Sequence, residues 1–302
     1  MTIVSARSLA ARTLACALLA AAPAHARAQT ASLFGGEYRD IETKYIFGFT
    51  DGSDIGSRGE KAIEFETNAT WRKRSGAFLG LEQEIAFEHV PTQNFFYEFA
   101  LHGAAHRIRD VEGLDNRNSA AFAGLSAKFR YLLLPRGPAS PIGLAISAEP
   151  EWSRVEGDSG AHTRAFETTV KIAADAELIE NRLYIGANLV YAPEVAKAVG
   201  DGAWARAAQW GVTGGLAYRI APKVTLGAGA QYYRVHDSFG FRRFQGDALY
   251  AGPTLHIQFK PKVMLAAAFS TQVAGHAGAD NRPLNLHDFG RHMARLKFEV
   301  EF

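Results

Sequence analysis

Hydrophobic and polar side chains alternate over many segments of this chain. In residues 63–71 the odd positions carry mainly apolar or small side chains, whereas the even positions are polar and include Glu64 and Glu66. Successive side chains of a β-strand point to opposite faces, so a period of two predicts a strand with one apolar and one charged face. Residues 77–88 repeat the pattern, with Leu81 and Ile85 on one face and Glu82 and Glu84 on the other.

The alternation continues to the last residue and predicts twelve strands in all. In residues 94–107 Phe99 opposes Glu98, and in residues 119–134 Phe129 opposes Lys128 and Arg130. The remaining segments are 142–153, 165–178, 183–192, 207–220, 223–235, 246–259, 262–274 and 289–302. An even number of strands is typical of bacterial single-chain membrane barrels.

The connections between these segments alternate in length. Short links fall at 91–93, 135–141, 180–182, 221–222 and 260–261, and longer ones at 108–118, 154–164, 193–206, 236–245 and 275–288. Short turns on one rim and long loops on the other are typical of outer-membrane barrels. Hairpins at a spacing near 40 residues are also compatible with propeller blades, but each unit holds two long strands where a blade holds four short ones.

The N-terminal region differs from the rest. Residues 1–28 combine Arg7 and Arg12 with an apolar stretch and the small-residue site Ala26-Arg27-Ala28, which predicts a signal peptide cleaved after Ala28 or Ala26. The apolar stretch continues past Cys16, the only cysteine, so lipidation is not expected. We assign residues 29–58 to a periplasmic segment or an inward-folded plug, and residues 59–302 to the barrel.

Composition narrows the function classes. The chain has 33 Lys and Arg against 31 Asp and Glu, too balanced for a nucleic-acid-binding surface. No stretch after residue 28 approaches the roughly 18 uncharged apolar residues of a membrane helix. An exported chain with two-faced strands therefore indicates an all-β, transmembrane, antiparallel up-and-down barrel of about twelve strands in the outer membrane, with lipid against its apolar face.

The final strand ends on an aromatic residue. Phe298, Val300 and Phe302 lie on its apolar face. This resembles the C-terminal insertion signal of bacterial outer-membrane proteins, and the resemblance implies recognition by the barrel-assembly machinery. The barrel as a whole, with Gly59-Glu60, the stretch 84–88 and the aromatic run 94–99, resembles the Gram-negative transporter-like outer-membrane barrels that include proteins associated with phenol-degradation operons. That resemblance implies passage of small organic solutes.

Facing the charged sides inward defines a lumen. We expect an acidic arc on the first three strands and basic residues from the fourth strand onward. Because a barrel closes, the basic residues of the last strand should face Glu64 and Glu66. The expected lumen-lining residues are Glu64, Glu66, Glu82, Glu84, Glu98, Lys128, Arg130, Arg291, Arg295 and Lys297.

The sequence favours a small-solute channel or transporter-like barrel over two alternatives. One is a structural or surface-interaction barrel that acts through its long loops. The other is a lipid-modifying enzyme, for which His236 and Ser238 are the only candidate pair, and a weak one. His102 and His106 would lie about 13 Å apart on one strand, too far to share a metal. We expect no catalytic residues, no metal and no cofactor, and we interpret Gly211, Gly215, Gly227 and Gly229, spaced by two, as packing space or curvature.

Overall fold

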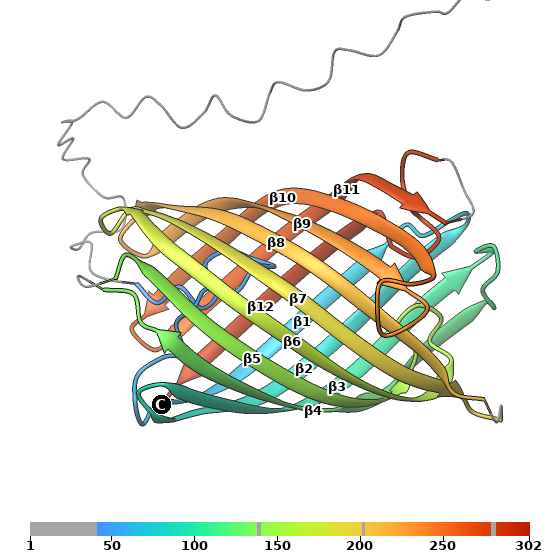
Figure 1. Cartoon of the computed structure of the whole chain (residues 1–302), viewed down its shortest axis with the longest axis horizontal. Coiled ribbons are helices and arrows are strands. Elements are labelled where there is room, and N and C mark those ends of the chain that lie inside the picture. The colour runs from blue at the N-terminus through green and yellow to red at the C-terminus, as the bar shows by residue number, and fades with distance from the viewer. Residues whose placement is uncertain (1–40, 138–139, 201–202, 279–281) are drawn as a thin grey trace, which may run out of the picture.

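The computed structural model describes residues 41–137, 140–200, 203–278 and 282–302, and these form a closed antiparallel β-barrel (Figure 1). Each strand pairs with its neighbours in sequence, and the first strand pairs with the last. The predicted fold class and strand number are confirmed. Among the described residues no helix is long and apolar enough to cross a membrane. The predicted signal peptide and Cys16 lie outside the described residues.

The twelve strands are 10 to 18 residues long. In chain order they are β1 (Lys61–Trp71), β2 (Ala77–Thr92), β3 (Phe95–Arg109), β4 (Arg117–Leu134), β5 (Ile142–Val155), β6 (His162–Ile179), β7 (Leu183–Ala198), β8 (Ala205–Ala221), β9 (Val224–His236), β10 (Phe244–Lys260), β11 (Val263–Ala277) and β12 (His292–Glu301). Alternation fixed most boundaries to within a few residues, because lipid outside and polar contacts inside impose opposite side chains on successive positions.

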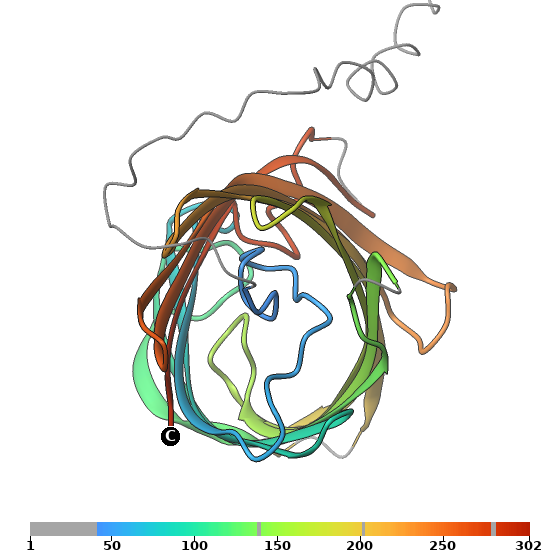
Figure 2. The same ribbon diagram turned by 90° about the vertical axis from the view of Figure 1, so that its left-hand side faces the viewer.

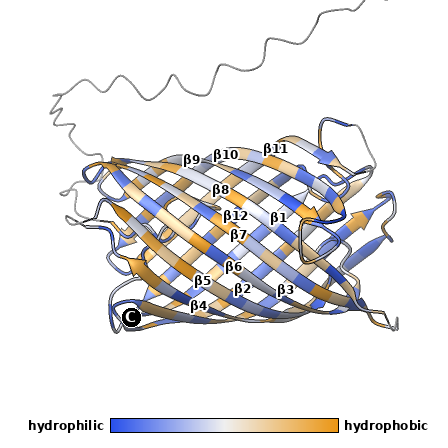
Figure 3. Ribbon diagram, viewed as in Figure 1, coloured by the Kyte–Doolittle hydropathy of each residue, from blue (hydrophilic) through white to orange (hydrophobic). Residues whose placement is uncertain are grey.

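The two faces of the wall differ as the alternation requires. Phe65, Phe99 and Leu101 point outward and are about half exposed, whereas Glu64 and Glu98 point inward and are completely buried. Figure 3 shows hydrophobic and hydrophilic residues alternating along the strands. An apolar exterior is the face a barrel presents to acyl chains, where charged side chains are costly.

The two rims carry connections of different length, with one exception: 135–141 on the short-turn rim is as long as most connections on the other rim. The short-turn rim holds 93–94, 135–141, 180–182, 222–223 and 261–262, and the long-loop rim holds 72–76, 110–116, 156–161, 199–204, 237–243 and 278–291. The expected long loop at 193–206 is mostly strand, since β7 runs to Ala198 and β8 begins at Ala205. Long hairpins continue past the apolar band because backbone pairing does not require apolar side chains.

Residues 41–60, which we call the luminal segment, lie inside the barrel (Figure 2). They contain no strand, and their only bridge joins Phe47 to Thr50. The luminal segment therefore adds no further strand to the barrel wall. Ile46 and Phe47 pack with Tyr184 of β7 and Ala217 of β8 in a small buried apolar cluster. The segment is thus a packed part of the interior.

Candidate functional site: a charged cavity above the luminal segment

The barrel encloses a cavity of about 1040 Å³ that runs from the luminal segment to the long loops. Lys44, Tyr45 and Asp51 of the luminal segment line it, as do Gly157 and Trp204 of two long loops. Its walls carry ten carboxylates and six Lys or Arg side chains, and Lys197, at an outward position of β7, borders its mouth. A polar, charged interior behind an apolar exterior is typical of outer-membrane barrels.

One side of the luminal segment is held by ionic contacts. The Lys44 ammonium lies between Glu88 of β2, to which it donates a hydrogen bond, and Glu299 of β12, at 3.2 Å. The Tyr45 hydroxyl donates to the same Glu88 carboxylate at 2.7 Å. These carboxylates are buried, so removal of Lys44 would leave them without their cation.

The other side is held by strands across the lumen. Asp51 forms an ion pair with Lys171 of β6 at 2.5 Å, and its backbone N–H donates to Asn188 of β7 at 2.8 Å. The Thr50 hydroxyl donates to Thr213 of β8 at 2.9 Å. Arg130 of β4 donates to the Gly52 carbonyl. The luminal segment is therefore anchored on six strands around the barrel: β2, β4, β6, β7, β8 and β12.

Glycines on the inner wall make room for one side chain of the segment. A Cβ atom added to Gly186 of β7 would come within 2.8 Å of the Phe47 ring, and one added to Gly215 of β8 would come within 2.8 Å of the Phe47 Cβ. Gly215 was interpreted from its spacing as packing space, and the packed group is Phe47. Only a residue without a Cβ permits such close approach.

The predicted seam between the first and last strands brings opposite charges together. Lys297 contacts Glu64 at 2.5 Å and Glu66 at 2.8 Å, and Arg295 contacts Glu66 at 3.1 Å. The β1–β12 register places Lys297 directly opposite Glu66. Arg291 does not take part: it is exposed ahead of β12, and its N–H donates to the Arg72 carbonyl at 2.9 Å. It precedes the strand, so the cross-strand register does not extend to its side chain.

The predicted acidic residues of β1 to β3 meet in the interior. Glu64, Glu88 and Glu98 present oxygens within 4.8 Å of one another. Each has a lysine partner, because Lys297 contacts Glu64, Lys44 contacts Glu88 and Lys128 contacts Glu98 at 3.2 Å. Paired ammonium groups offset the repulsion among these buried carboxylates. Glu84 lies near His102, at 3.6 Å, and Glu82 faces the cavity.

The acidic residues of β5 to β7 on the cavity wall were not among the predicted lumen-lining residues. Glu151 lies directly opposite Glu167, and Glu167 lies directly opposite Glu194, so three carboxylates form a row across neighbouring strands on the cavity wall. Like charges at directly opposed positions destabilise a sheet. No Lys or Arg forms an ion pair with any of the three within the described part of the chain. Strand parity alone places Glu151 and Glu167 inward, but Glu194 fell in a region predicted as loop.

Burial and neighbouring charges shift the pKa values of Glu42 and Asp51 in the luminal segment. Desolvation, with repulsion from Glu60, raises the pKa of Glu42 to about 8 although Lys44 opposes the shift. Desolvation also acts on Asp51, but Lys171 and Arg130 outweigh it and hold the pKa of that carboxyl well below its usual range. Asp51 is therefore a fixed negative charge at neutral pH, whereas Glu42 is largely protonated.

The candidate hydrolase pair is not assembled. His236 Nδ1 lies 3.2 Å from the Arg242 carbonyl, and the Ser238 hydroxyl donates to the same carbonyl at 2.9 Å. An activated serine needs the imidazole as its hydrogen-bond acceptor. Both side chains are instead occupied in closing the 237–243 loop.

Comparison with solved structures shows the fold. The chain is similar to the COG4313 outer membrane channel from Pseudomonas putida F1, with a TM-score of 0.53 and 11% identity over 83% of this chain and 98% of that one. It also matches the KdgM porin in complex with disordered oligogalacturonate (TM-score 0.46, 10% identity, 80% and 99% covered) and the Pseudomonas putida toluene transporter TodX (TM-score 0.41, 11% identity, 88% and 99% covered).

No curated protein matches the sequence. The family model described as "Family of unknown function (DUF6662)" matches residues 40–302, which is all of the chain after its first 39 residues. The described structure over this range is the barrel together with its luminal segment. The chain therefore belongs to the DUF6662 family and has the fold of an outer-membrane β-barrel.

Proposed function

We propose that this protein is an outer-membrane channel or transporter-like barrel for small solutes. The observation that carries the proposal is the cavity of about 1040 Å³, whose charged walls lie behind an apolar outer surface. Charges on both sides of a narrow aqueous space orient and select polar solutes.

The luminal segment acts as a plug in this proposal. It forms the end of the cavity nearer the short-turn rim, and polar contacts hold it to six strands. These contacts are ionic or polar, and water can replace them when the segment moves. Transport then requires displacement of residues 41–60 from the wall.

The finer proposal for the solute comes from the resemblance to transporter-like barrels associated with phenol-degradation operons. It implies small organic molecules as the cargo. The fold shared with the COG4313 channel is compatible with that type. Conductance measured with and without candidate aromatic solutes tests the proposed cargo separately from the channel function.

Export and insertion complete the proposal. Residues 1–28 direct secretion, and Phe298, Val300 and Phe302 form the insertion signal read by the barrel-assembly machinery. Phe302 is 59% exposed, and only its backbone N–H is engaged, donating to the Lys61 carbonyl at 2.8 Å. An exposed terminal ring is available to a partner.

Planar-bilayer conductance tests the channel and the plug together. We expect low conductance from the intact mature chain and a several-fold increase when residues 41–58 are deleted, with heat-dependent gel migration confirming that both fold. An unchanged conductance in the folded deletion variant contradicts the plug. Failure of both proteins to conduct contradicts the channel and favours a structural or surface-interaction barrel.

A further inference from the structure

The charges on the outer wall of the barrel are unevenly distributed. Among the outward-facing positions of the twelve described strands, Asp247 is the only acidic residue. Seven basic residues occupy outward positions near the long-loop ends of β3 and β5 to β9, and we call them the basic collar: Arg107, Arg109, Arg154, Arg164, Lys197, Arg206 and Arg234. Asp247 lies directly opposite Arg234, and the other six basic residues leave a net positive band at this rim.

None of the collar residues forms an ion pair in the part of the chain that the structure describes. Arg164 lies directly opposite Lys197, a like-charge pair that destabilises the sheet by itself. Lys197 and Arg206 instead contact aromatic rings, those of Trp204 at 5.2 Å and Phe239 at 5.6 Å. Ring contacts leave the charge available to an anion.

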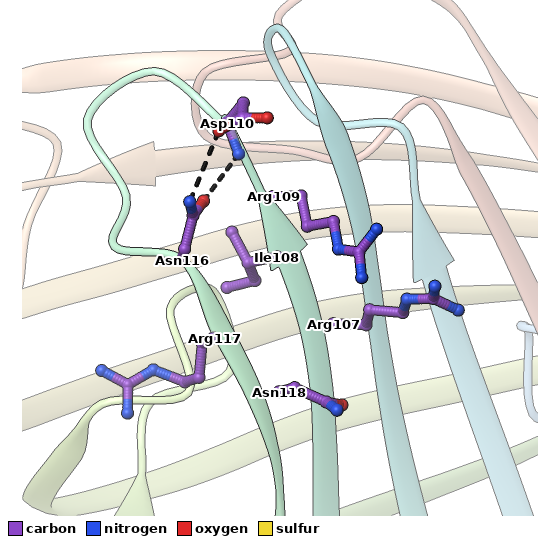
Figure 4. Close-up of a pocket in the computed structure, with 7 residues that line it drawn as sticks. All are labelled: Arg107, Ile108, Arg109, Asp110, Asn116, Arg117 and Asn118. Carbon is purple, nitrogen blue, oxygen red and sulfur yellow. Dashed lines mark hydrogen bonds between the residues drawn. The ribbon is translucent and has the colours of Figure 1, made fainter.

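One part of the collar forms a pocket. Arg107 and Arg109 are two residues apart on the same face of β3, and Asn118 of β4 lies directly opposite Arg107. They line a cavity of about 580 Å³ at the rim, closed by a loop in which Asn116 donates to Asp110 (Figure 4). In Figure 4 the Arg107 and Arg109 side chains extend to the same side of the strand. Two guanidinium groups and an amide are donors suited to phosphate oxygens.

Aromatic residues accompany the collar on the outer wall. The 237–243 loop folds over β7 and β8, where Phe241 stacks on Trp210 at 4.4 Å and the Tyr191 hydroxyl donates to the Phe239 carbonyl at 2.7 Å. This loop buries the outward-facing Ala208 and His236. Phe241 remains 68% exposed. Aromatic rings beside basic groups are typical of the headgroup level of a bilayer.

We infer that the basic collar binds the phosphate groups of anionic lipids in the leaflet at the long-loop rim. Arginine and lysine near a membrane surface are attracted to anionic headgroups. The seven side chains span six strands, so they contact several headgroups at once. The long loops face the cell exterior in outer-membrane barrels, which places the collar in the outer leaflet. This inference does not depend on the proposed channel function.

Lipid retention in native mass spectrometry tests the inference. The full mature chain is purified with equal amounts of phosphatidylglycerol and phosphatidylcholine, and the ratio of the two bound lipids is measured. We expect at least a fivefold preference for phosphatidylglycerol in the wild type. In the variant Arg107→Gln, Arg109→Gln, Arg164→Gln, Arg206→Gln the ratio should fall toward one.

A matched variant controls for net charge. Lys61→Gln, Lys223→Gln, Lys260→Gln and Lys262→Gln remove four exposed cations at the short-turn rim, and this protein should keep the wild-type preference. The inference is overturned if the collar variant keeps its preference, or if the control loses it equally. Should the collar variant fail to fold, 0.5 M salt must abolish the preference of the wild type, since exposed ion pairs are screened; a salt-independent preference overturns the inference.

Discussion

Phe47 lies so close to Gly215 that a Cβ atom on the glycine would come within 2.8 Å of the Phe47 Cβ. A residue at the start of the luminal segment is therefore fitted to a position on β8 that is 168 residues later in the chain. The contact links the sequence of the wall to the placement of the segment, and it can be tested without altering any charge.

Replacement of Gly215 by Leu should displace the luminal segment. The added side chain occupies the space of Phe47, so the segment loses its apolar contact with the wall and the conductance rises. Trypsin cleavage within residues 41–60 of the folded protein should become faster as well. Gly214→Leu on the same strand points outward and serves as the control; equal behaviour of the two variants would refute the fit.

The carboxylate row should set the ion preference of the open channel. In a protein lacking residues 41–58, Glu151→Gln, Glu167→Gln and Glu194→Gln together should lower the potassium-to-chloride permeability ratio at pH 9, because ionised carboxylates without cation partners are then removed from the wall. Reversal potentials in a salt gradient measure the ratio. Glu180→Gln, in an exposed short turn, should leave it unchanged. If the triple substitution leaves the permeability ratio unchanged, another part of the channel sets the ion preference.

Lys297→Met should destabilise the barrel by about 3–5 kcal/mol, the usual effect of leaving a buried carboxylate without its partner. Glu64 is completely buried and loses its 2.5 Å contact. Urea unfolding in lipid measures the change. Adding Glu64→Gln to the variant should recover part of the loss, since the unpaired charge is then removed. No recovery in the double variant would mean that Lys297 acts chiefly through Glu66.

Seating of the luminal segment should weaken as the pH rises. Glu42 has a pKa of about 8 in the seated segment and an ordinary value of 4.5 when released, so seating takes up a proton between these values. The seated state is then favoured at pH 5 and loses up to about 1.4 kcal/mol per pH unit through this window. Protease accessibility of residues 41–60 at pH 5 and pH 8.5 measures this effect. Glu42→Gln should flatten the dependence, and a persisting slope would assign it to another group.

Removal of Phe302 should slow membrane insertion without lowering the stability of barrels that have already folded. Its ring is mostly exposed, so the folded state gains little from it. The fraction of protein recovered in outer membranes after a short expression pulse reports insertion, and urea unfolding reports stability. Phe302→Tyr should insert normally. Equal insertion of the wild type and the truncated chain would reject the terminal signal.

The wall of the barrel could be predicted because lipid outside and charge inside impose a period of two, as in residues 63–71. Because the sheet closes, the contact between Lys297 and Glu64 could also be predicted from the alternation alone. The luminal segment could not be traced, since irregular backbone has no period and its partners, such as Lys171 for Asp51, are set by the three-dimensional enclosure. Glu194 was missed because residues 193–206 were predicted as a loop, whereas β7 continues through Pro193 to Ala198. Arg291 was wrongly expected in the lumen because the alternation of inward and outward side chains holds only within a strand, and Arg291 precedes β12.

The ring formed when β12 meets β1 also has a consequence for biogenesis. Residues 41–60 are the first of the described chain to be synthesised, yet they touch β12, which is the last. A segment that is made first and contacts the strand made last can complete its contacts only after β12 has been synthesised. Seating of the segment is therefore among the late steps of folding.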